Sequence, residues 1–217
     1  MKAVVFDLDG TLVDSVPDIH LAVNRMLADE GQEALDIATV TSFVGNGLPK
    51  LAERVMDHRG MDLADHARIT ADLLTIYQTT PAKLAQPYPG MEEALKSLQG
   101  AGYAMGVCSN KPHGPAVHLL CEMGLDGYFT TVIGGDSLPT RKPAPEMLQA
   151  TLAGLGGGAA LYVGDSEVDA ETAVNAGVGF ALFTRGYRKR PVAEIAHDYA
   201  FDEFCHLPDI VRAHFAG

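Results

Sequence analysis

Residues 3–11 of the chain read AVVFDLDGT, an apolar run that ends abruptly in two aspartates, a glycine and a threonine. A short, β-branched apolar run of this kind is typical of a buried strand in a parallel sheet. Because side chains alternate along a strand, Asp7 and Asp9 are expected to point to the same side. Open α/β sheets bind their ligands beyond the carboxyl ends of the strands, so this stretch predicts a reactive edge directly after the first strand.

Five later segments repeat this pattern of an apolar run with a polar or glycine ending. They cover residues 103–108, 131–134, 160–163, 179–183 and, more weakly, 199–201. Helical patterns lie between most of them, at 91–99, 115–123, 145–155 and 167–176, and most of these helices stop at glycine. The alternation predicts an α/β fold with a doubly wound, Rossmann-like parallel sheet.

One long stretch interrupts the alternation. Residues 15–86 carry helix signals only, beginning near Pro17 and continuing at 37–43, 49–58 and 64–79. Such a stretch is too long for the usual one-helix crossover between parallel strands. We therefore expect an all-helical cap domain over 15–86, inserted into an α/β catalytic core of residues 1–14 and 87–217. Residues 86–90, with two prolines, are expected to be a stiff return linker.

Charge and cysteine content exclude several classes of protein. The 217 residues include 16 Lys and Arg against 28 Asp and Glu, a formal net charge of −12, which disfavours binding to nucleic acid or to an anionic membrane. An anionic substrate must therefore be met by local positive charge. The three widely spaced cysteines form no disulfide framework or zinc motif, and no signal peptide or spanning segment is recognisable. These features favour a cytoplasmic protein.

A second pair of acids follows the segment 160–163. Asp165 and Asp169 are four residues apart across a loop and a first helical turn, so they can face one point. Taken alone, the pair is equally typical of helix capping. Beside Asp7 and Asp9, however, four clustered carboxylates repel one another strongly unless a cation joins them. An all-oxygen ligand set favours a hard ion, and Mg²⁺ before Ca²⁺.

Two other segment ends carry groups that suit a phosphoryl group. Ser109 and Asn110 follow the segment 103–108 and offer a hydroxyl, an amide and backbone N–H donors, although such a pair is often only a turn. Lys142 is followed by two prolines within three residues, which stiffen the backbone around it. This stiffness favours a lysine aimed inward to offset negative charge over a solvated surface lysine.

These residues occur at strand ends in the order DxDGT, Ser, Lys and GDxxxD, and the pattern resembles the haloacid dehalogenase-like phosphatase superfamily over essentially the whole chain. The resemblance implies three catalytic residues, with Asp7 as the nucleophile, Asp9 as the general acid/base and Lys142 as an electrostatic clamp. It implies phosphate contacts from Thr11, Ser109 and Asn110. It also implies a Mg²⁺ site formed by Asp7, the backbone carbonyl of Asp9 and Asp165, with Asp169 in an indirect, supporting role.

Phosphoryl transfer depends mainly on in-line positioning and charge neutralisation, which agrees with these roles. Attack of Asp7 on phosphorus would give an aspartyl-phosphate, one of the known carboxylate intermediates. Asp9 would give its proton to the leaving alkoxide and later take one from the hydrolytic water. A dehalogenase of the same superfamily has no such leaving group and is not expected to carry an aspartate at position 9.

Within that superfamily the finer similarity is to bacterial phosphoglycolate phosphatases. It is carried by residues 14–18, 43–47, 109–112 and 134–143. The departure is the segment 185–190, RGYRKR, which is more basic than the pattern expected of that group. The rim of the site is therefore the part for which the resemblance gives least guidance.

The cap is expected to select the substrate and to exclude water. Asn46 and Gly47, in the polar interruption GNG between two cap helices, are the candidate specificity residues, and an ordinary interhelix turn is the alternative. Lys50 and Arg54, one helical turn apart, could add positive charge for a substrate carboxylate, although the pattern favours a solvated face for either one.

The expected reaction is Mg²⁺-dependent hydrolysis of a small phosphate monoester through an aspartyl-phosphate, with 2-phosphoglycolate as the favoured substrate and glycolate as the product. A phosphatase or phosphomutase acting on another sugar phosphate or on pyrophosphate stays open, because the core motifs do not separate these activities. A non-enzymatic receiver-type phospho-switch is a remote alternative, since it needs neither a cap nor Asp9. The expected partner is a small phosphorylated metabolite, and the chain is expected to be a monomer or a homodimer.

Overall fold

The structure is a computed structural model that describes residues 2–79 and 84–216. Its main sheet has six parallel strands in the order β5-β4-β1-β6-β7-β8. Their bounds are β1 Lys2–Phe6, β4 Ala104–Cys108, β5 Thr131–Ile133, β6 Ala159–Gly164, β7 Gly179–Phe183 and β8 Tyr199–Phe201. The expected doubly wound sheet is confirmed, and each strand overlaps a segment predicted from composition.

The strand order places the topological switch at the centre of the sheet. From β1 the chain moves outward to β4 and β5, then returns to β6 on the other side of β1 and moves outward again to β8. Ligand sites of such sheets lie at the carboxyl ends of the strands where this reversal occurs. The loops that follow β1 and β6 therefore face each other across that crevice.

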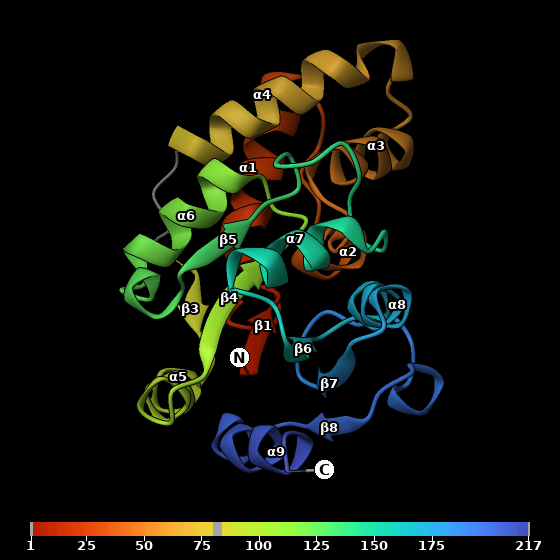
Figure 1. The fold of residues 1–217 in the computed structure, drawn as a ribbon. Coiled ribbons are helices and arrows are strands. Elements are labelled where there is room, and N and C mark those ends of the chain that lie inside the picture. Colours follow the sequence, from red (N-terminus) through yellow and green to blue (C-terminus); the bar gives the residue numbers. More distant parts are fainter. Residues whose placement is uncertain (1, 80–83, 217) are drawn as a thin grey trace.

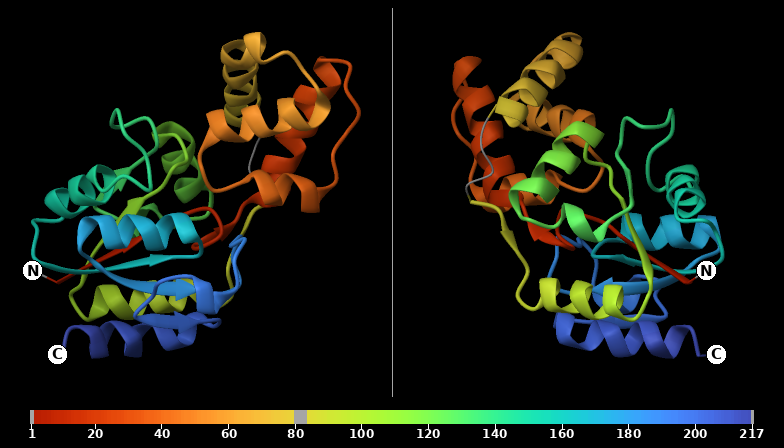
Figure 2. Two further views of the ribbon diagram at one scale, coloured as in Figure 1. Left: turned by 90° about the vertical axis from the view of Figure 1, so that its right-hand side faces the viewer. Right: turned by 60° about the vertical axis from the view of Figure 1, so that its left-hand side comes forward.

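Helices cover both faces of the sheet. Figure 2 shows α5 and α9 along one face and α7 and α8 along the other. The bounds in the core are α5 Met91–Gly100, α6 His113–Glu122, α7 Glu146–Gly154, α8 Glu167–Ala176 and α9 Leu207–His214, with short 3₁₀ turns η2 Asp126–Tyr128, η3 Val192–Glu194 and η4 Phe204–His206. Side chains alternate along β1, so the strand packs against both helix layers. Val4 and Phe6 pack with α5 and α9, and Ala3 and Val5 pack with α7 and α8.

Four helices between β1 and β4 stand away from the sheet and enclose a hydrophobic cluster of their own (Figure 1). They are α1 Val16–Asp29, α2 Ile37–Phe43, α3 Leu48–Arg59 and α4 His66–Thr79, with the 3₁₀ turn η1 Leu63–Asp65 before α4. Buried side chains such as Val23, Val55 and Ile69 form this cluster. We propose that these helices are the cap domain expected over 15–86, since a separate core is what defines a domain.

Two features of the fold were not anticipated. A two-residue strand β2, Val13–Asp14, pairs antiparallel with β3, Gln86–Pro87, where the chain enters and leaves the helical region. The expectation that 15–86 has helix signals only is therefore wrong at Gln86, and the expected linker begins as a strand. A pairing of two residues has no period to detect. Helix α9 was also missed, although its eight residues are amphipathic and bury Leu207 and Val211.

No helix of the described ranges 2–79 and 84–216 is long and apolar enough to cross a membrane.

Candidate active site

Three aspartates meet at the carboxyl ends of β1 and β6. Asp7 directly follows β1, and its backbone N–H donates to the Val163 carbonyl at 2.9 Å, which extends the pairing of β1 with β6. Asp165 directly follows β6, and Asp169 lies in the first turn of α8. One carboxylate oxygen from each of the three lies within 4.8 Å of the others, and all three residues are buried.

The ammonium group of Lys142 lies among these carboxylates. Lys142 Nζ is 3.0 Å from Asp7 Oδ1 and 2.7 Å from Asp169 Oδ1, and it donates to the Tyr162 hydroxyl at 2.9 Å. Burial alone would lower the pKa of Lys142, but the charges of Asp169 and Asp7 outweigh it and hold that pKa above its ordinary value. Lys142 is therefore a permanent cation beside Asp7.

Asp169 uses both of its carboxylate oxygens within the protein. Oδ1 accepts from Lys142 and from the Tyr162 hydroxyl at 2.8 Å. Oδ2 accepts from the Ser166 hydroxyl and backbone N–H and from the Asp165 backbone N–H. Burial acts to raise the pKa of Asp169, but Lys142 and these hydrogen bonds together lower it. Ser166 and Asp169 also form a capping box, so the helix-capping interpretation and the cluster interpretation hold at the same residue.

The negative charges of Asp7 and Asp165 are offset less completely than that of Asp169. Burial raises the pKa of Asp7 to about 6 against the lowering effect of Lys142. Burial, followed by the charges of Asp169 and Asp7, raises the pKa of Asp165 well above its usual range. Among the described residues, Asp7 Oδ1 has an ionic contact with Lys142 but accepts no hydrogen bond. Three buried carboxylates and one lysine leave a deficit of positive charge.

The backbone around Asp165 is packed closely against its carboxylate. A Cβ atom added at Gly10, where φ is +87°, would lie 2.5 Å from Asp165 Oδ2, so only glycine fits this turn. The Thr11 hydroxyl donates to Asp165 Oδ1 at 3.0 Å, and the Tyr187 backbone N–H donates to Oδ2. The shape and the charge of the cluster both fit a hard divalent cation held by oxygen atoms.

Asp9 does not belong to this cluster. Among the described residues, the carboxylate oxygens that lie within 4.8 Å of one another belong to Asp7, Asp165 and Asp169. The Asp9 carboxylate lies outside this group of three, although its charge adds to the effect of burial in raising the pKa of Asp7. Strand β1 ends at Phe6, and the following backbone turns so that three successive N–H groups donate to the Leu8 carbonyl. The alternation of a strand therefore does not extend to residue 9.

The Asp9 carboxylate is instead bound by residues from two other segments. Lys111 Nζ, on the loop after β4, donates to its two oxygens at 2.9 and 3.2 Å. The Ser15 hydroxyl, at the start of α1, donates to Oδ1. Lys111 also donates to the Tyr77 hydroxyl of α4 at 2.5 Å and lies over that ring, 4.3 Å from its centroid. Lys111 belongs to the segment 109–112 that carries the resemblance to phosphoglycolate phosphatases, but no spacing along the chain predicts its contacts with Asp9 and Tyr77.

Of the expected phosphate ligands, Ser109 is placed next to Asp7. Ser109 is buried, and its hydroxyl lowers the pKa of Asp7 by a hydrogen bond, although burial has the larger, opposite effect. The Asn110 side chain accepts from the Lys142 backbone N–H at 3.0 Å and donates to the Lys142 and Gly45 carbonyls. Thr11 and Asn110 thus direct their side chains to Asp165 and to the Lys142 backbone.

In the helical region the expected specificity residues, Asn46 and Gly47, lie in a loop that is held by hydrogen bonds from Arg54. Asn46 Oδ1 accepts from the Arg54 guanidinium at 2.8 Å, and the same guanidinium donates to the Phe43 carbonyl. A Cβ atom at Gly47 would lie 3.0 Å from the Asn110 carbonyl, so this loop lies directly against the core. Lys50 is exposed and paired with Glu53.

The basic segment 185–190 connects the core to the start of α1 through its tyrosine. The Tyr187 hydroxyl donates to Asp14 at 2.6 Å and accepts the backbone N–H groups of Ser15 and Val16. Lys189 lines the same small crevice as Asp9 and Asp165. The segment therefore forms part of the rim of the site.

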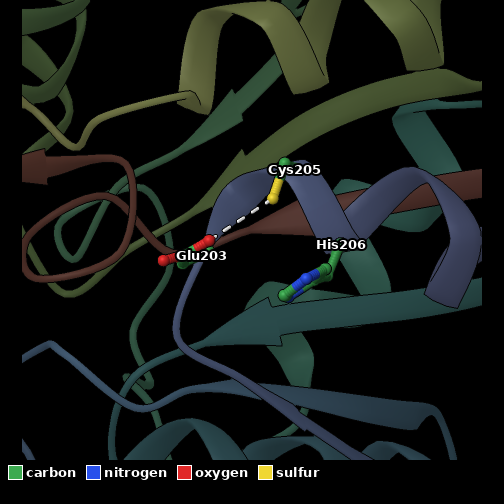
Figure 3. A group of neighbouring side chains, drawn as sticks. All are labelled: Glu203, Cys205 and His206. Atoms are coloured by element: carbon green, nitrogen blue, oxygen red, sulfur yellow. Dashed lines mark hydrogen bonds between the residues drawn. The ribbon is translucent and has the colours of Figure 1, made fainter.

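A second group of metal-ligating side chains lies elsewhere, in and beside η4. Glu203, Cys205 and His206 offer three ligand atoms within 4.8 Å of one another (Figure 3). All three residues are exposed. The Cys205 Sγ lies 3.7 Å from the Glu203 carboxylate, and the His206 backbone N–H donates to the Glu203 carbonyl at 3.1 Å. This group shares no residue with the buried cluster.

Comparisons with known proteins agree with this geometry. A phosphoglycolate phosphatase of Cereibacter sphaeroides strain ATCC 17029 is 49% identical over 214 residues, which is 98% of each chain. One from Rhodobacter capsulatus is 45% identical over 97% of this chain and 96% of its own. A crystal structure described as a predicted phosphoglycolate phosphatase from Haemophilus somnus 129PT superposes with a TM-score of 0.89 at 30% identity, covering 97% of each chain. The sequence pattern of haloacid dehalogenase-like hydrolases matches residues 4–183, and the chain belongs to this family.

Proposed function

We propose that this chain is a Mg²⁺-dependent phosphatase that hydrolyses 2-phosphoglycolate to glycolate and phosphate. The observation that carries the proposal is the buried meeting of Asp7, Asp165, Asp169 and Lys142 at the topological switch of the sheet. Relatives that are 45–49% identical over nearly the whole chain and are named phosphoglycolate phosphatases support the substrate. The same relatives favour a phosphatase over a phosphomutase or a receiver-type switch.

The donor set supports Mg²⁺ as the metal. Asp7, Asp165 and the backbone carbonyl of Asp9 would hold the ion, and Asp169 would support it indirectly, since its oxygens are already in use within the protein. Asp7 Oδ1, which accepts no hydrogen bond among the described residues, and the charge deficit of the cluster are what the ion would satisfy. When bound, the ion supplies positive charge to the non-bridging phosphoryl oxygens.

Asp7 is the proposed nucleophile. Its carboxylate oxygen forms a bond to phosphorus while the bond from phosphorus to the substrate's ester oxygen breaks, which gives an aspartyl-phosphate. Lys142 lies beside that carboxylate and offsets charge on the phosphoryl group in the transition state. The Ser109 hydroxyl and nearby backbone N–H groups are the proposed donors to the phosphoryl oxygens. Thr11 and Asn110 act indirectly, by holding Asp165 and the Lys142 backbone.

Asp9 is the proposed general acid/base. It gives a proton to the departing ester oxygen, so glycolate leaves as an alcohol, and it then takes a proton from the water that attacks the aspartyl-phosphate. Its carboxylate lies at the boundary with the helical region, next to Ser15 and Lys111. This is the side from which a leaving group covered by the cap would be expected to depart.

The direct test is a comparison of phosphate release from 2-phosphoglycolate with and without Mg²⁺, together with trapping of the phosphorylated enzyme. The proposal expects release only with the metal, and a single acid-stable, base-labile phosphoryl group on Asp7. Release without metal, or transfer of phosphate to a sugar acceptor in place of water, would contradict it. We also propose a cytoplasmic location, in keeping with the free cysteines Cys108, Cys121 and Cys205. The proposed monomer or homodimer is tested by light scattering after gel filtration.

A further inference from the structure

We infer that Lys111 and Tyr77 form the subsite that binds the substrate's carboxylate. The inference rests on the proposed function and deepens it, by naming the residues that distinguish a phosphorylated hydroxy acid from an uncharged alkyl phosphate. Neither residue lies in the cluster of Asp7, Asp165, Asp169 and Lys142.

Lys111 is a buried cation at the wall of a cavity between the core and the helical region. Its side chain is 4% exposed. The cavity, of about 60 Å³, is lined by aliphatic side chains of α1, α3 and α4 and by the polar residues Asp9, Tyr77, Ser109, Asn110 and Lys111. A carboxylate entering such a space loses most of its water, so it needs a cation and hydrogen-bond donors there.

The covalent structure of the substrate places its carboxylate near Lys111. In 2-phosphoglycolate one methylene group separates the ester oxygen from the carboxylate carbon. Asp9 must approach the ester oxygen to protonate it, so the carboxylate must lie within a few ångströms of Asp9. Lys111 Nζ is 2.9 Å from Asp9 Oδ1 and is therefore the cation at the required place.

Lys111 is itself bonded to Asp9 and Tyr77, but both of these partners line the same cavity, whereas the other candidate cations lie or are engaged away from it. Lys189 lines the neighbouring crevice with Asp165 and Glu167 and not this cavity. Arg54 donates to the Phe43 carbonyl and to Asn46, and it lines a different, open hollow with Lys189. Lys50 is exposed and paired with Glu53. Lys142 is held by Asp7 and Asp169 on the phosphoryl side. Among the described residues that line the cavity, Lys111 alone carries a positive charge.

Tyr77 makes the subsite depend on the cap. Its hydroxyl accepts from Lys111 Nζ, and its ring lies against the ammonium group, so α4 orients a lysine that belongs to the core. The Tyr77 O–H can in turn donate to a carboxylate oxygen. The subsite is complete only when α4 lies over the loop after β4. Recognition of the substrate's carboxylate is therefore coupled to closure of the helical region over the core.

The experiment measures kcat/KM for 2-phosphoglycolate and for its neutral carboxamide, 2-phosphoglycolamide, in the wild-type protein and in variants. The ratio of the two values reports recognition of the negative charge, because effects on the shared phosphoryl chemistry cancel. Lys111→Met is expected to lower this ratio about 10- to 150-fold, the range for a lost hydrogen bond to a charged group. Lys111→Arg should restore at least part of the ratio, because it keeps the charge.

Tyr77→Phe keeps both Lys111 and Asp9 and removes one hydroxyl. It should lower the ratio about 10- to 150-fold, the range for one lost hydrogen bond to a charged group. This variant keeps the inference testable if Lys111→Met does not fold, since Lys111→Met leaves Asp9 without its cation. Lys96→Met, the same substitution at an exposed lysine paired with Glu92 on α5, is the matched control and should leave the ratio unchanged.

Equal losses for the acid and the amide in Lys111→Met and in Tyr77→Phe would overturn the inference, because they would show that both residues act only through Asp9 or through folding. A different result would contradict the proposed function alone. In that result, kcat/KM for 2-phosphoglycolate ranks below that for other metabolites, while the preference for the acid over the amide still depends on Lys111. A wild-type protein with no preference for the acid would contradict both.

Discussion

Lys142 Nζ lies 3.0 Å from Asp7 Oδ1, although the two residues are 135 positions apart in the sequence and each is nearly excluded from solvent. The contact joins the loop after β5 to the loop after β1, and it places a permanent positive charge beside the proposed nucleophile. Asp169 holds the same ammonium group from the side of α8. We therefore expect stability and catalysis to depend on the same buried charges.

Replacing Asp7 by Asn should abolish turnover and leave the fold intact. The substitution removes the proposed nucleophile and one metal ligand but no apolar surface, so we expect a loss of at least about 10⁴-fold in kcat, in line with other removed nucleophiles. Phosphate release and a thermal melt measure the two effects. Turnover within about tenfold of the wild-type rate would exclude Asp7 as the nucleophile.

Replacing Lys142 by Met should destabilise the protein strongly. The variant leaves Asp7 and Asp169 buried without their cation, and breaking a buried ion pair in this way costs about 3 to 5 kcal/mol of unfolding free energy. Urea denaturation in the presence of a chelator measures the loss. The exposed variant Lys96→Met is the control and should change that free energy by less than about 0.5 kcal/mol. Equal unfolding free energies for the two variants would show that Lys142 does not neutralise the cluster.

Replacing Asp9 by Asn should affect substrates according to their leaving groups. Alkyl phosphates need a proton on the departing oxygen, and a general acid contributes about 10²- to 10⁴-fold. An aryl phosphate such as p-nitrophenyl phosphate needs no such proton and should lose much less. The comparison of kcat for ethyl phosphate and p-nitrophenyl phosphate decides the matter, because equal losses would argue against the general-acid role.

Binding of Mg²⁺ should stabilise the protein more at pH 8 than at pH 5. Burial raises the pKa of Asp7 to about 6 and that of Asp165 well above its usual range, so without metal the fold is favoured by protonation and is weakened as these groups ionise at higher pH. Mg²⁺ needs the ionised carboxylates, so protons compete with it below about pH 6. The shift in melting temperature caused by Mg²⁺ at the two pH values measures this.

The same metal titration separates Mg²⁺ from Ca²⁺. The larger Ca²⁺ accepts more ligands and can take both oxygens of Asp7, which would block attack. Ca²⁺ should therefore bind and inhibit. A Mg²⁺ shift that is larger at pH 5 than at pH 8, or Ca²⁺ that supports turnover as well as Mg²⁺, would count against the proposed ligand set.

The sequence predicted the strands and the convergence of their ends better than it predicted individual side-chain contacts. Apolar runs locate strands because burial and period are local properties, and parallel strands bring their carboxyl ends together whatever lies between them. The partner of Asp9 was not predictable in this way. Lys111 and Tyr77 approach it from β4 and α4, and no spacing along the chain encodes that contact. The strand β2 was missed because two residues carry no periodicity, and α9 was missed although its eight residues are amphipathic.

The central claim is tested most directly by ranking kcat/KM for a panel of phosphorylated metabolites with Mg²⁺ present. The panel should contain 2-phosphoglycolate, ethyl phosphate, hexose phosphates, nucleotides and pyrophosphate at one pH and ionic strength. The account predicts that 2-phosphoglycolate ranks first and exceeds ethyl phosphate by about 10- to 150-fold, the effect of one buried charge-assisted contact. A rank level with or below hexose phosphates, nucleotides or pyrophosphate would contradict it.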